Sequence, residues 1–436
     1  MSYGGGTFLV QNKVLPGSYI NFVSKAYSST IFGDRGVAAI GLELDWGEEG
    51  KIITVTSGDF QTKAVEIFGY DYTDSSLKGL RDLFLNVKTL YAYRLNGGGN
   101  KATGTYATAK YSGTRGNSIK IAVETNVDDN TKFDVITYLG SDIVDEQTVA
   151  SASALVSNNF VDFNTSATLA VTAATALTGG TNGTVTNTKH SNFLAALESY
   201  TFNALGLVTT ESTLKSLYFN YTKRMRDELG IKFQTVIYDY ATADYEGVVS
   251  VKNSVSDAGV NTASLVYWVT GIIAGCAVNK SNLSKKYDGE FTVSAEYTQA
   301  QLEGFVTGGQ FALHKTGDEL RVLADINTLT TTSDTKGDDF KQNQTIRVCD
   351  QIAMDIAAIF NTRYLGVVQN DKAGRASLWN DIVKHHMKLN DIRAIEDFDS
   401  TGVTVEQGET KDSVVVYDAI TPVNAMSKLY MTVTVA

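Results

Sequence analysis

The residues with the most evident chemical potential are two adjacent histidines, His385 and His386, of only four in the chain. Imidazole nitrogens bind metals and shuttle protons, so the pair suggests a metal site or a catalytic base. Neighbours on a helix point about 100° apart, whereas helical metal ligands are spaced three or four residues apart. Since no His, Cys or carboxylate follows at that offset in a distinctive pattern, we expect a solvated or interface pair and no metal site.

Two glycine-rich segments, 96–100 and 178–184, superficially suggest phosphate-binding loops. Neither carries the Gly-Lys-Ser/Thr ending of such a loop, and neither opens an apolar helix. Loose glycine clusters are common in turns. We therefore expect flexible hinges at both places, and no cofactor.

No catalytic nucleophile can be identified. The chain has no Gly-x-Ser-x-Gly elbow, and its two cysteines, Cys276 and Cys349, lie in apolar runs rather than in exposed, electropositive surroundings. Two cysteines are too few for a disulfide framework, so they are expected to be buried free thiols in a reducing compartment. We expect no enzyme active site.

The elements around these groups begin with a predicted arm at residues 1–20. Gly4-Gly5-Gly6 is flexible, Phe8 to Leu15 suits an extended strand, and Pro16-Gly17 breaks what precedes it. Residues 21–95 form the first part of a globular domain. Its predicted strands are 52–56 and 89–93, with a helical repeat of leucines between them.

The two glycine-rich segments enclose a region, residues 96–183, that is rich in Thr, Ala, Ser, Val and Gly. Its strand-length segments are 105–111, 118–125, 132–139 and 160–164. They predict a small β-sandwich inserted into a larger domain.

Residues 184–335 alternate between helix and strand, which predicts a central α/β domain with a largely parallel sheet. Its apolar stretch at 263–278 is too short to span a membrane, so we expect a buried core segment.

Residues 336–425 are predicted to form a C-terminal α+β domain. A helical apolar stripe covers 346–360, a second helix covers 377–389, and segments 403–405 and 413–417 flank a hairpin turn at Gln407-Gly408-Glu409. The fold class expected for the whole chain is therefore multi-domain α/β plus all-β, with an extended arm at each end.

The C-terminal arm, residues 426–436, alternates apolar and polar residues and so predicts a half-buried strand. Such a strand must either fold back onto its own sheet or pair elsewhere. Folding back is the commoner outcome, but Pro422 before this strand and the glycines before the N-terminal one favour reaching outward.

Length and charge limit the class of protein. With 436 residues the chain is too long for one core, and its 43% hydrophobic and 19% charged residues are typical of folded domains. A net charge of −11 argues against nucleic acid as the main partner. The N-terminal residues show no signal peptide, so we expect synthesis and folding in the cytoplasm.

The sequence resembles the phage tail sheath family, in particular the sheaths of Gram-positive contractile phages and of phage-tail-like particles. The segments that carry the resemblance are 8–19, 109–117, 265–271, 285–290, 322–327, 361–366 and, most specifically, 421–430. These segments contain no catalytic motif. They therefore indicate the fold and the role in assembly, and not an active site.

The resemblance implies a non-catalytic, subtilisin-like central domain, a β-sandwich on the outside and a C-terminal domain that faces a tail tube. Hexameric rings would stack into a helical sheath, assembled in the bacterial host cytoplasm, that ends as a virion tail or a released particle. Besides the tail tube protein, baseplate and tail terminator proteins would be partners, without direct nucleic-acid contact or membrane insertion. The sheath would contract to drive the tube through a cell envelope.

Candidate assembly residues follow from the arms and the C-terminal domain. The N-terminal arm offers Phe8, Leu9, Val10 and Val14, and the C-terminal arm offers Leu429, Met431, Val433 and Val435. The hairpin that would accept a strand contains Val403, Val405, Val414 and Val416. The tube-facing candidates are Lys384, His385, Lys388, Asp391 and Arg393.

Two other classes of protein remain open at this point. A tail tube or surface-layer protein would share the composition rich in Gly, Thr and Tyr that is typical of β-strands. A tube subunit, however, would be shorter and would lack the helices at 211–229 and 343–360. An enzyme with a nucleotide-binding α/β domain is a more distant alternative that would need a bound ligand.

Overall fold

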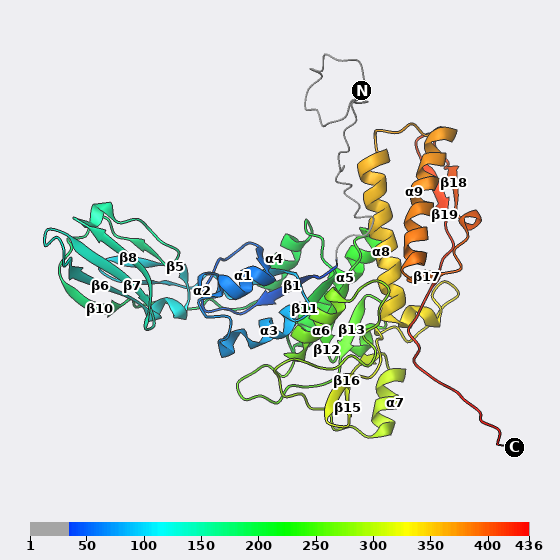
Figure 1. Cartoon of the computed structure of the whole chain (residues 1–436), viewed down its shortest axis with the longest axis horizontal. Coiled ribbons are helices and arrows are strands. Elements are labelled where there is room, and N and C mark those ends of the chain that lie inside the picture. Colours follow the sequence, from blue (N-terminus) through cyan, green and yellow to red (C-terminus); the bar gives the residue numbers. More distant parts are fainter. Residues whose placement is uncertain (1–34, 436) are drawn as a thin grey trace, which may run out of the picture. The chain divides into compact units, whose positions relative to one another are not determined.

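A computed structural model describes residues 35–435 of the protein. Its centre is a seven-stranded sheet, in which all neighbouring strands are parallel except β2 and β3 (Figure 1). In spatial order the strands are β14 (Gln310–Phe311), β13 (Val248–Val251), β12 (Gln234–Tyr238), β11 (Ala204–Leu207), β1 (Val37–Leu42), β3 (Thr89–Arg94) and β2 (Ile53–Thr56). The predicted, largely parallel α/β sheet is thus confirmed.

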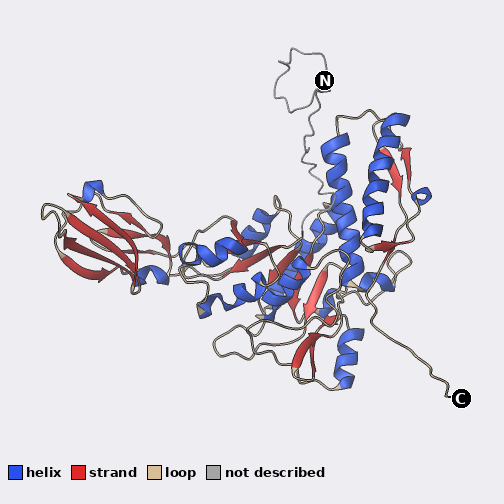
Figure 2. Ribbon diagram, viewed as in Figure 1, coloured by secondary structure: helices blue, strands red, loops and turns tan. Residues whose placement is uncertain are grey.

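Helices cover both faces of this sheet (Figure 2). One face packs against α1 (Ser57–Thr62), α2 (Ala64–Phe68), α3 (Lys78–Phe84) and α6 (Leu265–Gly275), and the other against α4 (Asn187–Leu197) and α5 (Ser212–Lys223). Because successive strand residues point to opposite faces, Ala38 and Ile40 of β1 belong to the first core and Ala39 to the second. Burial on both sides explains why β11 and β13 are fully buried and apolar except for Ser250.

Helix α6 is the predicted apolar core segment, and nearly all of it is buried. Trp268 on this helix donates its indole N–H to Asp288 at 2.8 Å. Gly271 and Gly275 lie directly against the backbone of Leu83 and Asn86, so a side chain at either position would separate α6 from α3. No helix within residues 35–435 is long and apolar enough to cross a membrane.

A surface layer follows α6 in the chain. It contains α7 (Gln299–Thr307) and the hairpin of β15 (Leu313–Thr316) and β16 (Glu319–Val322).

The region after β3 is a sandwich of two antiparallel sheets, as predicted. One sheet has the order β10 (Thr172–Ala176), β6 (Ile119–Thr125), β7 (Phe133–Leu139) and β8 (Asp142–Val149). The other has the order β4 (Lys101–Thr103), β5 (Ala107–Ser112) and β9 (Val161–Phe163). β4, β8 and β10 were not predicted. All three are edge strands, in which only Ala102 and Val149 are buried, so they lack the apolar alternation of a half-buried strand.

Trp46 lies on the loop after β1 but packs inside the sandwich core, edge-on to Tyr111 and stacked near Phe160. Its indole N–H donates to the carbonyl of Glu66 at 3.1 Å. The two domains therefore share a buried side chain.

The prediction of flexible hinges at the two glycine-rich segments is wrong. These segments run side by side and are hydrogen-bonded from Gly183 N to Asn96 O at 2.9 Å and from Thr181 N to Asn100 O at 3.1 Å. Asn182 donates to Asp45 Oδ1 at 2.7 Å and accepts from Thr114 N at 3.2 Å. We call these paired segments, with loop 45–49 and residues 113–117, the sandwich joint.

In the sandwich joint, glycine allows two backbone segments to lie in direct contact, which a side chain would prevent. Gly113 has φ +130°, and a Cβ there would overlap the carbonyl oxygen of Asp45. Arg115 donates to the carbonyl of Gly69 at 2.7 Å and covers the ring of Tyr70 at 4.3 Å. Buried Arg94 binds the carbonyls of Gly47 and Ser112. The joint is thus cross-linked from several directions.

The C-terminal part contains two long helices, α8 (Asn343–Ile359) and α9 (Lys372–Asp391), connected by a π turn at Phe360–Tyr364. Around α9 lie β17 (Ile395–Glu396), β18 (Thr404–Gln407), β19 (Val414–Tyr417) and β20 (Thr421–Pro422). The predicted hairpin is the antiparallel pair β18 and β19.

Candidate assembly site

The β18–β19 hairpin is a sheet of two strands that packs on α9 by one face. Trp379 donates its indole N–H to the carbonyl of Val403 at 2.9 Å, and Val403 is buried with Leu378 and Ile382. Val405 and Val414 are partly buried against the same cluster, whereas Val416 is 38% exposed. Within residues 35–435 no third strand pairs with either strand, so both outer edges keep unpaired backbone groups.

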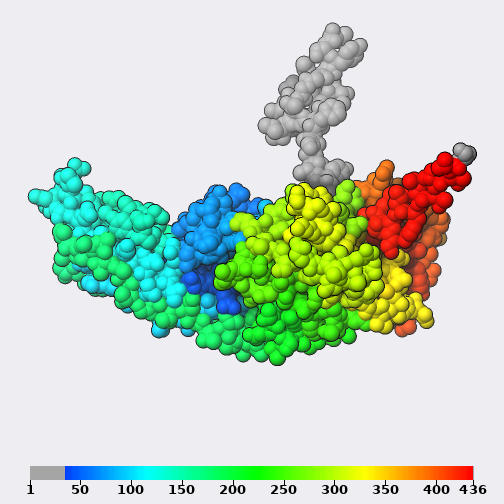
Figure 3. All heavy atoms as spheres, turned by 90° about the horizontal axis from the view of Figure 1, so that it is seen from below, coloured from blue at the N-terminus to red at the C-terminus, as the bar shows by residue number. Residues whose placement is uncertain are grey.

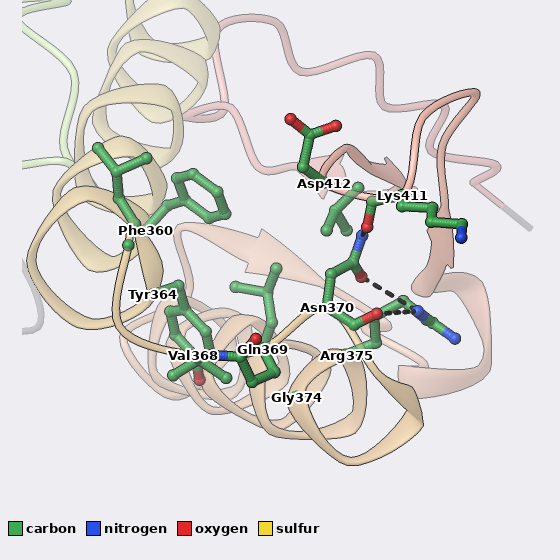
Figure 4. A pocket seen from close by; sticks show the side chains of 13 residues that line it. Phe360, Tyr364, Val368, Gln369, Asn370, Gly374, Arg375, Lys411 and Asp412 are labelled. Atoms are coloured by element: carbon green, nitrogen blue, oxygen red, sulfur yellow. Dashed lines mark hydrogen bonds between the residues drawn. The ribbon is translucent and has the colours of Figure 1, made fainter.

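A pocket of about 410 Å³ lies beside the hairpin (Figure 4). Its apolar lining comes from Phe360, Tyr364, Val368, Leu378 and Val414. Across it, Asn370 donates to the carbonyls of Lys411 and Ser413 at 2.9 and 2.7 Å, while Arg375 donates to Asn370 Oδ1 at 3.0 Å. These amide contacts tie the hairpin turn to the start of α9.

The chain beyond β19 is held for a short distance and is then free. Val423 N donates to Ala394 O at 3.0 Å, Asn424 bonds Thr345, and Ala425 N donates to Gln344 Oε1 at 3.0 Å. We call residues 418–425 the arm root. From Met426 to Val435 the side chains are exposed (Figure 3).

The predicted half-buried strand at the C-terminus is absent from the single chain. Residues 423–435 form neither helix nor strand, and Leu429, Met431, Val433 and Val435 are 68–90% exposed. The arm therefore does not fold back onto a sheet of its own subunit. The N-terminal candidates Phe8, Leu9, Val10 and Val14 lie outside the described residues.

The prediction that His385 and His386 are a solvated or interface pair is wrong, because both side chains are fully buried within the chain. His385 Nε2 lies 3.0 Å from Asp355 Oδ2, the two Nδ1 atoms lie 3.0 Å apart, and His386 Nε2 lies 2.7 Å from Asp418 Oδ2. His385 consequently cannot be a tube-facing surface residue. Within residues 35–435 no group of three or more His, Cys, Asp or Glu side chains could hold a metal ion.

The other tube-facing candidates lie at the surface at the end of α9. Lys384, Asp391 and Arg393 are exposed and Lys388 is half-buried. None of the four takes part in a salt bridge within the described chain. Their charges are thus available to another molecule.

The two cysteines, predicted to be buried free thiols, are free, and each is partly buried. Burial raises the pKa of the Cys349 thiol to about 11 and also raises that of Cys276. Both are therefore poor nucleophiles.

Sequence reasoning missed the residues that hold the arm root and the hairpin turn: Asp355, Asp418, Gln344, Asn370 and Asn424. Their partners are distant in sequence, so no local pattern marks them. The nearest signal was the histidine pair itself, whose partners Asp355 and Asp418 lie 30 and 32 residues away.

Comparison with known proteins decides the family. Models of phage tail sheath regions match almost the whole described chain: the N-terminal region of domain III of tail sheath protein Gp18 at 35–95, the β-sandwich domain at 97–182, the central domain at 183–328 and the C-terminal domain at 335–436. The chain belongs to the phage tail sheath family.

Individual relatives agree with this family. The phage-like element PBSX protein XkdK of Bacillus subtilis is 31% identical, over 99% of both chains. The sheath tail protein of Desulfitobacterium hafniense superimposes with a TM-score of 0.83 at 37% identity, covering 95% of this chain and 99% of that one. The anti-feeding prophage sheath in its contracted helical state shares the fold, with a TM-score of 0.57 at 13% identity, over 97% and 99% of the two chains. This sheath protein is accordingly a structural subunit of a tail.

Proposed function

We propose that the subunit polymerises as stacked hexameric rings by strand exchange, its C-terminal arm adding a strand to the β18–β19 hairpin of a neighbour. The observation that carries this proposal is the exposed apolar row of Leu429, Met431, Val433 and Val435 in a chain whose hairpin has open edges. Each subunit then offers both a donor strand and an acceptor edge.

The entropy lost when the arm becomes ordered explains why it needs an apolar groove on the neighbour as well as an unpaired strand edge. Ordering a residue costs about 1–2 kcal/mol of backbone entropy, which is comparable to the net gain from one hydrogen bond, about 0.5–1.5 kcal/mol. The surplus must come from burying the apolar row, at about 1.5–3 kcal/mol per side chain. The partly buried Val405 and Val414 and the neighbouring pocket supply apolar surface beside the hairpin.

The C-terminal domain is proposed to face a tail tube, with baseplate and tail terminator proteins as further partners. Its unpaired Lys384, Lys388, Asp391 and Arg393 suit weak charge pairs that repeat from ring to ring. Contraction then drives the tube through a cell envelope, while paired arms keep the subunits connected. The likeness to a sheath described in a contracted state supports a subunit of this kind.

The arm is tested by exchanging its two side-chain rows. Replacing Leu429, Met431, Val433 and Val435 with Ser should abolish polymers in negative-stain microscopy and leave a folded monomer, because the apolar row provides the surplus free energy. Replacing Tyr430, Thr432 and Thr434 with Ser is the matched control and should retain polymers. Polymers of normal length from the first variant would refute arm exchange.

The sandwich is proposed to be peripheral and dispensable for ring formation. Since Trp46 packs in the sandwich core and would lose that packing, replacing residues 97–182 with a short Gly/Ser linker should be combined with Trp46→Ser. This variant should still form rings by microscopy. A soluble monomer that never assembles would contradict a peripheral role.

A further inference from the structure

A pocket of about 620 Å³ lies at the carboxyl ends of β1 and β11, which are neighbours in the central sheet (Figure 1). Its lining includes the first residues after each strand, 43–44 and 208–211. The chain forms β1, then β3 on one side of it, and later β11 on the other, so the strand order reverses between β1 and β11. In open parallel sheets such a reversal leaves a crevice where ligands bind. We call this pocket the β1–β11 crevice.

The unpaired charge of the crevice is negative. Glu43 and Glu211 line it, are exposed, and form no salt bridge within residues 35–435. Lys78 also belongs to the lining, but its ammonium already pairs with Asp257 Oδ1 at 2.8 Å. Burial, and after it the charge of Glu43, raise the pKa of Tyr267 in the same lining to about 12. This phenol is therefore neutral, and the two free carboxylates determine the charge.

Two nearly buried polar side chains in the lining carry groups without a partner. Ser264 is 3% exposed and precedes α6, and its hydroxyl has no hydrogen bond within residues 35–435. His190 of α4 is 4% exposed; its Nδ1 lies 2.9 Å from the hydroxyl of Tyr218, and its Nε2 has no partner in the same part of the chain. Burial lowers the pKa of His190 to about 4, so the ring is neutral. Buried polar groups are normally hydrogen-bonded, so both indicate a polar partner that enters the crevice.

The hydrogen-bonding groups of the crevice favour a cation over an anion. Helix starts bind anions through free backbone N–H groups, but at α4 the N–H groups of Lys189 and His190 already donate to the carbonyl of Thr186, at 3.0 and 3.3 Å. At α6 the N–H of Tyr267 donates to the carbonyl of Ser264 at 3.1 Å. The Ser264 hydroxyl can accept, and His190 Nε2 accepts when Nδ1 carries the proton. With the two carboxylates, these groups fit a cation that has several N–H donors.

We propose that the β1–β11 crevice binds a lysine side chain of a second copy of the chain through Glu43, Glu211 and Ser264. An ammonium is a compact charge with three donors on a flexible stem, so it can bind groups that come from different walls of the crevice. The inference rests on the proposed polymer, although not on strand exchange, because a sheath holds the lysines of neighbouring subunits at high effective concentration. Each subunit has a net charge of −11, so contacts between copies need local pairs of opposite charge.

Zero-length cross-linking of the assembled full-length protein tests this contact. Subunits with normal and with heavy nitrogen are mixed, polymerised and treated with a carbodiimide, which joins a carboxylate to a lysine amine in contact with it. Mass spectrometry should find Glu43 or Glu211 joined to a lysine in peptides of mixed isotope, which only two different subunits can give. Cross-links of these carboxylates within one isotope alone, or no cross-link at either of them, overturn the proposal.

Neutralising both carboxylates gives a second measurement. Glu43→Gln combined with Glu211→Gln should raise the protein concentration needed for polymerisation about fivefold, the effect of losing two partly exposed charge pairs. Glu124→Gln is the matched control, because Glu124 is an exposed carboxylate of β6 without a salt bridge in the described chain, and it should polymerise as wild type. An unchanged threshold in the double variant would also overturn the proposal.

Two further results separate this contact from its alternatives. Putrescine is the probe for a free amine: if it raises the thermal midpoint of the monomer only when Glu43 is present, and polymers give no mixed cross-links, the crevice binds a free amine and the proposal fails. The variant with Ser at 429, 431, 433 and 435 separates the contact from strand exchange. If it polymerises and gives mixed cross-links, strand exchange fails and the crevice contact stands; arm-dependent polymers without these cross-links have the opposite meaning.

Discussion

The sandwich joint and the arm root are both places where a segment leaves the packed core, and they are built in opposite ways. At the joint, two chain segments cross together, share hydrogen bonds and are cross-linked by Asp45, Arg94 and Arg115. At the arm root a single segment is held by a few hydrogen bonds, and its side chains are exposed from Met426 onward. The first arrangement ties the sandwich to the core through many contacts, and the second leaves the arm exposed.

The contrast teaches that glycine content alone does not show which segment moves. The glycine-rich segments are at the rigid connection, where the missing Cβ lets backbones touch. Residues 426–435 contain no glycine and yet pack on nothing within the described chain. Contacts with the rest of the protein, rather than backbone freedom, decide the difference.

The largest effect on the comparison is expected from Gly113→Ala. Its Cβ would overlap the carbonyl of Asp45 at a positive φ, so we expect a loss of at least about 3 kcal/mol in the free energy of unfolding. Gly140→Ala is the matched control, because Gly140 also has a positive φ but no atom within 4 Å of its Cβ position. It should cost only about 1 kcal/mol in the same urea titration.

If Gly113→Ala and Gly140→Ala lowered the free energy of unfolding equally, the backbone of the sandwich joint would be able to shift to accept a side chain. The joint would then not differ from the arm root in how tightly it is held.

Asparagines at the two places allow a closer comparison. Asn182→Ala removes two hydrogen bonds from the joint and should lower the free energy of unfolding by about 1–3 kcal/mol. Asn424→Ala removes the contact with Thr345, but the arm root can open without unfolding the domain. The midpoint of unfolding should therefore stay within error, while amide exchange at 421–425 increases. A global loss from Asn424→Ala would show that the arm root is part of the cooperative core.

The smallest effect per residue is expected at the surface of α9. Reversing Lys384 and Lys388 to Glu should leave stability and sheath-only polymers intact, since exposed pairs contribute about 0–1 kcal/mol each. Repetition over many rings should nevertheless abolish tube-loaded particles, as counted by electron microscopy. Reversing Lys101 and Lys120 on the sandwich is the control and should allow normal loading. Normal loading in both variants would remove this surface as the tube contact.

Much of the central sheet could be predicted from sequence because burial leaves a local record there. The valines and isoleucine of β12 and β13 and the apolar stretch of α6 are buried in the core, and their clustering in sequence marks them. In helix α8, by contrast, the apolar pattern of the sequence does not predict which side chains are buried. Its apolar stripe from Cys349 to Phe360 is only half-buried, whereas Arg347 and Asp350 are buried because they pair with Asp325 and Arg226.

Among the candidate assembly residues, some could likewise be predicted from a local pattern and others could not. The apolar row of the arm follows from alternation along a strand, which any window of the sequence shows. The burial of His385 and His386 depends on carboxylates from other elements, which arrive only through the tertiary fold. A local pattern of two polar residues therefore pointed to solvent, in error.

The three tryptophans of the chain give the protein a spectroscopic label in each region. Trp46 lies in the sandwich core, Trp268 in the core under the central sheet, and Trp379 against the hairpin of the C-terminal domain. Each indole N–H has a different acceptor, the carbonyl of Glu66, the carboxylate of Asp288 and the carbonyl of Val403. Variants that retain one tryptophan would therefore report, by emission wavelength and quenching, which region changes its surroundings as a sheath forms and shortens, without an added dye.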